Sequence, residues 1–316
     1  MKVVIAFDLG AEFVEDMGAS FPEVEFASAL TDEEQLREVP DAEVQFGTIS
    51  REAFAAGEKL KWFSFIGIGF DSVTRNVPEI VDSSVAMTLS RGVHAAVMAD
   101  HALGMIVALA HRLPETLADQ QKRIWDTKKY LRTIKELSGS TLGILAFGDI
   151  GRETAKRAVG FDMSVYAVDL APRPADEVTV WGLDRLDDML ALSDWLVVTA
   201  PRTEQTLGMI GTRELQALKE GAGVIVVSRG GIVEEEALVE ALKSGRVAGA
   251  ALDATVEEPP VDDSPLWDAP NLILTPHVSA ESDELVRRRG NLFKENLRRY
   301  LAGEPLEGVA DKKRGF

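Results

Sequence analysis

The chain has 316 residues, of which 46% are hydrophobic and 27% are charged, a composition typical of a globular α/β protein. Because one hydrophobic core rarely organises a chain of this length, we expect two domains. The 52 acidic residues exceed the 34 basic ones and give a net charge of −18. This balance excludes a broad surface for nucleic acid, since phosphate neutralisation needs clustered Lys and Arg.

The chain contains no cysteine, which excludes a disulfide scaffold, a thiolate metal site and a cysteine nucleophile. Redox chemistry would therefore need a bound cofactor, and we expect no metal. The first apolar run is too short for a signal peptide and is more typical of a buried strand. The longest apolar stretch, Ala102–Ala110, is about half as long as a bilayer-spanning helix requires. We therefore expect a cytoplasmic protein without a membrane partner.

Two series of short apolar runs alternate with helical patterns, and each series predicts a doubly wound parallel sheet covered on both faces. The first series has its strands at Val3–Phe7, Val24–Ala27, Val44–Phe46, Trp62–Ile66 and Val85–Thr88. A long helix over 97–112 and a polar stretch over 115–136 follow. The second series has its strands at Thr141–Phe147, Ser164–Val168, Trp195–Thr199, Gly223–Val227, Gly249–Leu252 and Leu272–Thr275.

The last segment, residues 280–301, is a charged helical pattern with no strand after it, and we expect it to pack back on the first sheet. This predicts one discontinuous domain, residues 1–97 plus 281–316, and a second domain over 98–280.

A glycine-containing loop, Ala146–Gly151, lies between the first strand of the second series and a helical pattern. Such a turn presents backbone N–H groups and a helix N-terminus to a pyrophosphate. Gly148 and Gly151 match the dinucleotide fingerprint, whereas Ala146 stands where its first Gly belongs.

Asp169 ends the next strand, about 20 residues further on, where an acid binds a ribose 2′-hydroxyl. This favours NAD over NADP, although Arg173 lies nearby in the sequence. The competing interpretation of Asp169 is a helix cap or a solvated loop acid.

Three polar residues each follow a strand of the second series at its carboxyl end, where open α/β sheets bind ligands. Arg229 can hold a carboxylate by a bidentate fork, or it is an ordinary surface Arg. His277 can exchange a proton near neutral pH, or it caps a helix. Glu258, or its neighbour Glu257, can fix the tautomer of an imidazole, or it is a solvated acid beside a proline turn. The other histidines fall on or near the long helix, where packed or solvated side chains are ordinary: His94, His101 and His111.

The order of Arg229, Glu258 and His277 after the glycine loop resembles the D-isomer-specific 2-hydroxyacid dehydrogenases, over nearly the whole chain. Residues 207–233 resemble a signature of that family, residues 67–71 resemble its substrate loop and residues 90–101 its linker helix. The sequence departs from the family pattern at Leu89, Asp100 and Ala146. The resemblance implies a flavodoxin-like substrate domain and a Rossmann dinucleotide-binding domain.

The resemblance also assigns roles. Arg229 would bind the substrate carboxylate and carbonyl, His277 would donate the proton, and Glu258 would orient His277. The amides of Ile68 and Gly69 would bind the substrate carboxylate. The implied cofactor site, with Arg229 also near the nicotinamide, consists of Gly148, Asp149, Ile150, Gly151, Asp169, Ala200, Pro201, Thr206, Val227, Ser228, Asp253 and His277.

The implied reaction is hydride transfer between NAD(H) and a small 2-keto or 2-hydroxy acid. One alternative is a non-catalytic NAD(H)-sensing protein, similar to corepressors on this scaffold. A formate or phosphite oxidiser is disfavoured, because a formate enzyme would carry Gln where Glu258 stands. The chain ends soon after its last helix, so we expect a glyoxylate or hydroxypyruvate reductase rather than a feedback-controlled serine-pathway enzyme.

The family forms homodimers through a segment resembling residues 100–135, so Trp125 would either reach a neighbouring active site or pack at the interface.

Overall fold

The computed structural model describes residues 1–313, with Asp71 described only by its backbone, and the chain divides into two compact units. The first unit contains Met1–His94 and the segment from Ser282 onwards, and the second contains Ala95–Glu281. The predicted boundaries at 97 and 280 lie three residues and one residue from these crossings. Residues 314–316, which end the predicted first domain, lie outside the described part of the chain.

The first unit is a five-stranded parallel sheet in the order β2-β1-β3-β4-β5. Its strands are β1 (Lys2–Ala6), β2 (Glu25–Ser28), β3 (Val44–Gly47), β4 (Trp62–Phe65) and β5 (Ala86–Leu89). Its helices include α1 (Ala11–Ser20), α2 (Asp32–Glu38), α3 (Arg51–Ala56) and α4 (Asp71–Asn76), with short 3-10 turns η1 (Val39–Asp41) and η2 (Pro78–Ile80). Neighbouring strand residues such as Val3 and Val4 enter different hydrophobic clusters, so both faces of the sheet are buried. This two-sided burial explains the continuous apolar runs.

The last helix, α12 (Leu285–Ala302), packs on the first sheet as expected. The ring of Phe293 stacks on Phe46 with centroids 4.2 Å apart, and it lies 5.5 Å from the ring of Trp62. Beyond α12, Ala310 N–H donates to Met87 O, and Leu89 N–H donates to Gly308 O. The segment around Gly308 and Ala310 therefore lies along the edge of β5.

The second unit is a seven-stranded parallel sheet in the order β12-β11-β10-β9-β6-β7-β8. The strands are β6 (Thr141–Leu145), β7 (Ser164–Val168), β8 (Val178–Trp181), β9 (Trp195–Val198), β10 (Ala222–Val226), β11 (Val247–Leu252) and β12 (Leu272–Leu274). Strand β8 has no counterpart among the strands predicted from the sequence. This strand lies at the sheet edge beside β7 and is half-exposed, and Thr179 interrupts its short apolar run.

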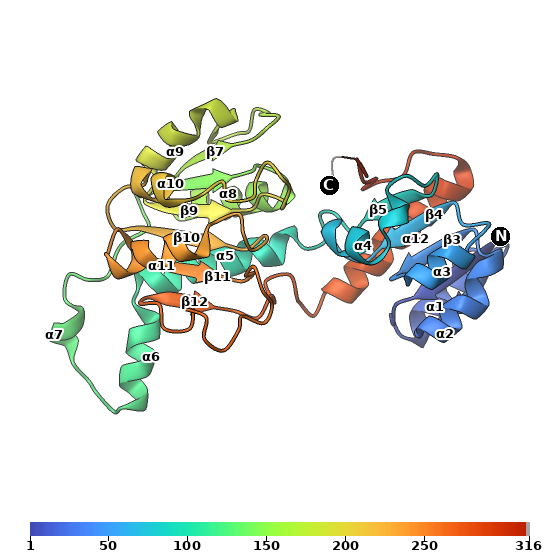
Figure 1. The fold of residues 1–316 in the computed structure, drawn as a ribbon, viewed down its shortest axis with the longest axis horizontal. Helices are drawn as coiled ribbons and strands as arrows, with labels where there is room; N and C mark the ends of the chain where they lie inside the picture. The colour runs from blue at the N-terminus through green and yellow to red at the C-terminus, as the bar shows by residue number, and fades with distance from the viewer. Residues whose placement is uncertain (314–316) are drawn as a thin grey trace. The chain divides into compact units, whose positions relative to one another are not determined.

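Helices cover both faces of this second sheet (Figure 1). On one face, α9 (Leu186–Leu192), α10 (Thr212–Ala217) and α11 (Glu235–Lys243), with the 3-10 turn η3 (Leu183–Arg185), contribute to the same apolar cluster as the strands. Elsewhere in the unit, α5 (Ala95–Ala110) and α8 (Asp149–Gly160) pack against each other. The helix predicted over 97–112 is thus α5, and it begins slightly earlier.

The polar stretch over 115–136 forms two helices, α6 (Leu113–Gln121) and α7 (Thr127–Tyr130), which project from the rest of the second unit (Figure 1). Asp119 Oδ2 accepts hydrogen bonds from Lys129 Nζ at 2.6 Å and Tyr130 Oη at 2.7 Å, which joins the two helices. Trp125 lies between them and is 97% exposed. We call residues 113–135 the arm.

Within the described residues, no single helix has both the length and the apolar character needed to cross a bilayer. The pair α5 and α6 meets that test only together, by length and composition, with a bend of 66° between them.

Candidate active site

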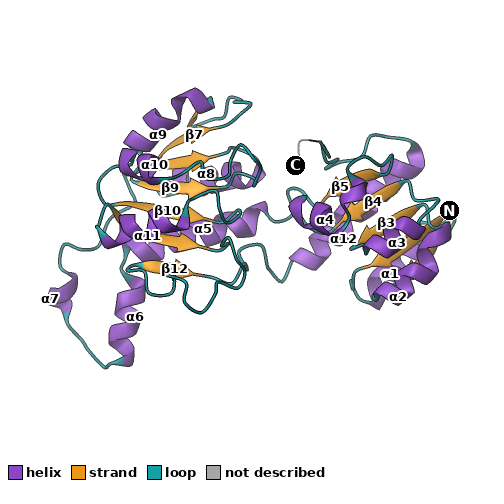
Figure 2. Cartoon of the chain, in the orientation of Figure 1, coloured by secondary structure: helices purple, strands orange, loops and turns teal. Residues whose placement is uncertain are grey.

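Most of the predicted site residues lie where strands of the second sheet end. The strands are all parallel, so their carboxyl ends share one edge of the sheet (Figure 2). The chain proceeds from β6 to β7 and β8 on one side, and to β9, β10, β11 and β12 on the other. The strand order therefore reverses between β6 and β9, which is the position where open α/β sheets bind ligands.

The glycine loop leaves room beside the N-terminus of α8. Gly148 caps this helix, and a Cβ built on it would meet no heavy atom of the described residues within 4 Å, its chain neighbours aside. Gly151 differs, because its Cβ would lie 2.6 Å from Ala146 O. Gly151 is thus required by packing, whereas the open space at Gly148 fits a pyrophosphate beside the amides of Asp149 and Ile150.

Ala146, which replaces the usual first glycine, adopts the left-handed φ of 73°. Its amide donates to Val168 O at 2.9 Å, and its carbonyl accepts from Thr199 Oγ1 at 2.7 Å. Neighbouring strands therefore hold this peptide on both sides in a conformation that glycine adopts more easily.

Asp169 connects the end of β7 to the glycine loop. Its Oδ2 accepts from Phe147 N at 2.7 Å, and its Oδ1 accepts from Ala171 N at 2.8 Å. These two bonds fix a half-buried carboxylate beside the loop, whereas Arg173 is exposed. The bonds go to loop amides, so Asp169 does not act here as a helix cap.

His277 and Glu258 meet although they follow different strands. Both carboxylate oxygens of Glu258 lie 2.9 Å from Nδ1 of His277, and Oε1 also accepts from Thr255 N at 3.2 Å. Glu258, and not its neighbour Glu257, is therefore the residue that contacts His277. Because an ionised carboxylate can only accept, Nδ1 carries the proton of this contact and Nε2 is the remaining ring nitrogen.

The backbone of His277 is left-handed, with φ of 53°. Asp253 anchors it: Oδ1 accepts from Thr275 Oγ1 at 2.5 Å and from Val278 N at 3.0 Å, and Oδ2 accepts from Ser279 N at 2.8 Å. Burial raises the pKa of the Asp253 carboxyl, but these hydrogen bonds together lower it by more, so this pKa lies below its ordinary value. Asp253 is thus an ionised anchor for the loop that carries His277.

Arg229 follows β10 on a loop in close contact with the loop of Glu258. A Cβ on Gly230 would lie 2.0 Å from the carbonyl carbon of Thr255, so only glycine allows the two backbones to approach this closely. Arg229 is half-buried, and its Nη1 donates to Ser228 O at 2.8 Å.

Glu235, the first residue of α11, holds the Glu258 loop from the side of that helix. Its Oε1 accepts from Val256 N at 2.6 Å. Burial raises the pKa of Glu235, and the charges of neighbouring glutamates raise it further, although the bond from Val256 lowers it.

The remaining residues predicted for the cofactor site occupy two loops of the same sheet edge. After β9, Thr206 Oγ1 donates to Pro201 O at 2.7 Å and accepts from Thr203 N at 2.8 Å, which closes the turn that begins at the buried Ala200. After β10, Val227 and Ser228 are buried.

Ile68 and Gly69 belong to the first unit and follow β4. Ser72 Oγ donates to Gly69 O at 3.2 Å, and Ser90 N donates to Gly67 O at 2.9 Å, so this loop is fixed at both ends. Both residues are half-buried. Their role toward a substrate stays a prediction.

Sequence reasoning missed several residues that organise this edge. Thr199 and Thr275 each follow a strand directly, a position at which the sequence predicted only Arg, Glu and His as site residues. Glu235 and His101 gave no such signal, because each acts on a loop that is distant in the sequence.

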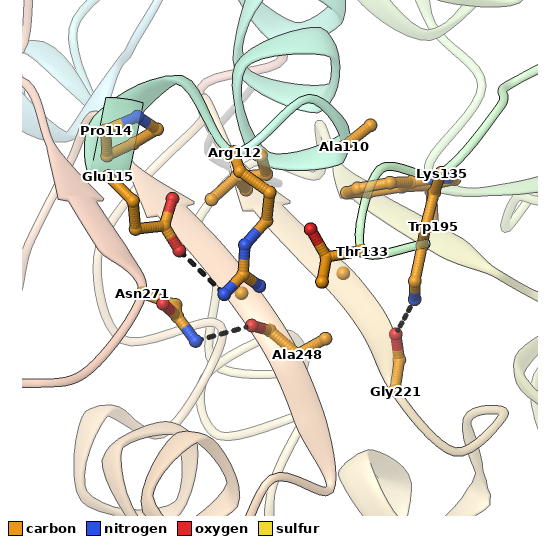
Figure 3. Close-up of a pocket in the computed structure, with 13 residues that line it drawn as sticks. Ala110, Arg112, Pro114, Glu115, Thr133, Lys135, Trp195, Gly221, Ala248 and Asn271 are labelled. Atoms are coloured by element: carbon orange, nitrogen blue, oxygen red, sulfur yellow. Dashed lines mark hydrogen bonds and ion pairs between the residues drawn. The ribbon is translucent and has the colours of Figure 1, made fainter. Parts of the chain in front are cut away.

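A small pocket lies at the opposite, amino-terminal edge of the second sheet, beneath the start of the arm (Figure 3). Its cations are engaged within the chain: Arg112 Nη2 pairs with Glu115 Oε1 at 2.9 Å, and Lys135 Nζ donates to Gly221 O at 2.7 Å. This pocket is therefore separate from the edge that carries His277.

Comparisons with known proteins relate the chain to dehydrogenases of 2-hydroxy acids and reductases of 2-keto acids. A family model described as D-isomer specific 2-hydroxyacid dehydrogenase, NAD binding domain, matches residues 103–279. D-3-phosphoglycerate dehydrogenase of Archaeoglobus fulgidus is 33% identical over 98% of this chain and 59% of its own length. The chain thus spans little more than half of that relative. Hydroxypyruvate reductase of Thermotoga maritima is 33% identical over 84% of this chain and 89% of its own length.

Two solved structures are similar in fold to this chain and cover its whole length. A D-isomer specific 2-hydroxyacid dehydrogenase of Xanthobacter autotrophicus Py2, in complex with NADPH and MES, is 27% identical with a TM-score of 0.85, covering 100% of this chain and 99% of its own. An NADPH-dependent glyoxylate/hydroxypyruvate reductase of Sinorhizobium meliloti, in complex with NADP and sulfate, is 25% identical with a TM-score of 0.86 and the same coverage.

Proposed function

The chain belongs to the D-isomer-specific 2-hydroxyacid dehydrogenase family, and from this we propose that it is an oxidoreductase that interconverts a small 2-keto acid and its 2-hydroxy acid. The observation that carries the proposal is the contact of His277 with Glu258, at the same sheet edge as Arg229 and the glycine loop. A proton donor, a carboxylate-binding cation and a dinucleotide loop are the three parts that such a reduction requires.

His277 acts as the acid. Its Nδ1 is held by Glu258, so Nε2 is the atom that would donate a proton to the keto oxygen of the substrate. The carboxylate of Glu258 fixes the tautomer of the ring through this contact. In the reverse direction, the neutral imidazole of His277 takes the proton from the hydroxyl.

Arg229 binds the other polar end of the substrate. Its guanidinium offers a fork of N–H donors that suits a carboxylate and polarises the adjacent carbonyl. We expect the amides of Ile68 and Gly69 to bind the same carboxylate.

The cofactor fits the second unit, because the space beside Gly148 and the start of α8 suits a pyrophosphate. The bound nicotinamide would supply or accept the hydride. Asp169 supports NAD rather than NADP, since its fixed carboxylate would accept a ribose hydroxyl and repel a 2′-phosphate. The solved relatives that hold NADPH or NADP make this preference worth measuring.

We further propose a homodimer in the cytoplasm, formed through the arm. Several large apolar side chains of the arm are exposed, and they would be covered by a second copy. These are Leu113, Leu117, Ile124, Trp125, Leu131 and Ile134. In such a dimer Trp125 lies at the interface or enters the neighbouring active site.

The substrate class is a short 2-keto acid such as glyoxylate or hydroxypyruvate. These two acids appear in the names of related proteins from Thermofilum pendens, a glyoxylate reductase, and Thermotoga maritima, a hydroxypyruvate reductase. The test is NADH oxidation with glyoxylate, hydroxypyruvate and phenylpyruvate, and 3-phosphoglycerate oxidation in reverse, followed at the nicotinamide absorbance. Turnover of any 2-keto acid that depends on His277 supports the proposal. NADH binding without turnover of any substrate would favour a cofactor-sensing protein instead.

A further inference from the structure

His101 lies in the middle of α5, yet it contacts the loop of His277. Its side chain is 16% exposed, and its Nε2 lies 3.3 Å from Thr275 Oγ1 and 3.9 Å from Asp253 Oδ1. The position of His101 on the long helix predicts an ordinary packed or solvated histidine. Its polar contact 174 positions further along the chain requires a different explanation.

The direction of these hydrogen bonds follows from the chemistry of the groups. Asp253 is ionised and can only accept, so the hydroxyl of Thr275 donates its hydrogen bond to Asp253 Oδ1, at 2.5 Å. Thr275 must then accept from His101, which means that Nε2 of His101 carries a hydrogen. The result is a directed chain from His101 through Thr275 to Asp253.

Asp253 accepts hydrogen bonds from residues on both sides of His277 and so holds the loop in place. Thr275 lies two residues before His277, and the amides of Val278 and Ser279 lie directly after it. A left-handed backbone at a histidine persists only where its surroundings hold it in place. The geometry of His277 thus depends on the carboxylate that Thr275 and His101 help to orient.

The helix that carries His101 is itself fixed to the glycine-loop helix. Asp100 Oδ1 accepts from Arg157 Nε of α8 at 2.5 Å, and α5 packs along α8. Two consecutive residues of α5 therefore contact α8, through Asp100, and the loop of His277, through His101.

We propose that His101 is a positioning residue for His277, acting through Thr275 and Asp253. This rests on the proposed acid role of His277. It predicts that His101 affects the chemical step more than cofactor binding, because its contacts orient the proton donor rather than the dinucleotide loop.

The test compares His101→Leu, which removes the donor, with His101→Gln, which keeps an N–H at similar reach. His111→Leu is the matched control, since His111 is exposed just beyond the end of α5. We expect His101→Leu to lower kcat by about tenfold or more, as small misplacements of a reacting group do. The NADH dissociation constant and the melting temperature should stay near the values of the control, and His101→Gln should recover most of the loss. Equal kcat in His101→Leu and His111→Leu would overturn the proposal, as would an inactive His101→Gln protein that remains folded.

A second measurement does not depend on turnover. Long-range ¹H–¹⁵N spectra report the tautomer of each of the four imidazoles, assigned with single His→Gln variants. We expect the Nε2–H tautomer for His101 and the Nδ1–H tautomer for His277, with the His277 signals changed by His101→Leu and unchanged by His111→Leu. A His101 ring without hydrogen on Nε2, or His277 signals indifferent to His101→Leu, contradicts the proposal even if the protein reduces no keto acid. Absence of turnover alone contradicts only the proposed function.

Discussion

Glu258 places both of its carboxylate oxygens 2.9 Å from Nδ1 of His277. If this pair transfers the proton, His277→Ala should lower kcat by about 10²- to 10⁴-fold, the range for loss of a general acid. Glu258→Gln keeps an acceptor but loses the charge, so it should cost less than His277→Ala. Steady-state kinetics with the best keto acid, together with NADH titration by fluorescence, measure both effects. Near-normal turnover in His277→Ala, with NADH binding retained, would contradict the assignment.

Most strands could be predicted from the sequence, because both sheets are buried on both faces. Strands such as β9 and β10 are fully buried, and the sequence shows them as unbroken apolar segments. The edge strand β8 is half-exposed and follows a segment rich in proline and acids, so it produced no comparable run. The arm was predicted only as a polar stretch, since its short helices do not face a core.

In the candidate site, too, the sequence predicts some residues and not the contacts between them. Arg229, Glu258 and His277 could be singled out because each lies on the loop that follows a strand, and in parallel sheets these loops share an edge. The contact between His277 and Glu258 bridges 19 positions, and that between His101 and Thr275 bridges 174. Contacts of this kind depend on how loops and helices pack against one another, which the local pattern of residues does not encode.

The two glycines of the cofactor loop should respond differently to an added methyl group. Gly148 has φ −77° and open space around its Cβ position, so Gly148→Ala should leave the melting temperature unchanged while weakening NADH binding. Gly151→Ala would place Cβ 2.6 Å from Ala146 O, and should lower the free energy of unfolding by about 1–3 kcal/mol. Urea unfolding and NADH titration of both variants separate the two effects. Unaltered NADH affinity in Gly148→Ala would argue against a pyrophosphate at this loop.

Asp169 should determine the choice of cofactor. Removing its charge in Asp169→Ala should lower kcat/KM with NADH and reduce the preference for NADH over NADPH, because the repulsion of a 2′-phosphate disappears. Asp169→Asn is the matched variant, since it keeps an acceptor for one of the amides of Phe147 and Ala171 without the charge. A shift in both variants points to charge, and a shift in Asp169→Ala alone points to loop geometry. An unchanged ratio in both would remove Asp169 from cofactor selection.

Ala146→Gly should stabilise the protein. The left-handed φ of 73° costs an L-residue about 1–2 kcal/mol, and glycine avoids this cost but loses about 0.5–1 kcal/mol through the entropy of its unfolded chain. We therefore expect the free energy of unfolding to rise by about 0.5–1 kcal/mol, measured in urea. The same change at Ala155, within α8, should have the opposite sign. A loss of stability in Ala146→Gly would mean that the bonds to Val168 and Thr199 require the methyl group.

Salt should leave NADH binding intact or strengthen it. Both cofactor and substrate are anions, whereas the protein carries a net charge of −18, so the field of the whole chain opposes binding. Binding then depends on local groups: the amides around Gly148 and the guanidinium of Arg229. Raising the ionic strength to about 0.15 M shortens the screening length to about 8 Å, which weakens the distant repulsion more than these short contacts. NADH titrations across added NaCl should show a constant or falling dissociation constant. A steep rise would instead indicate binding by an exposed cluster of cations, which the arrangement around the glycine loop does not predict.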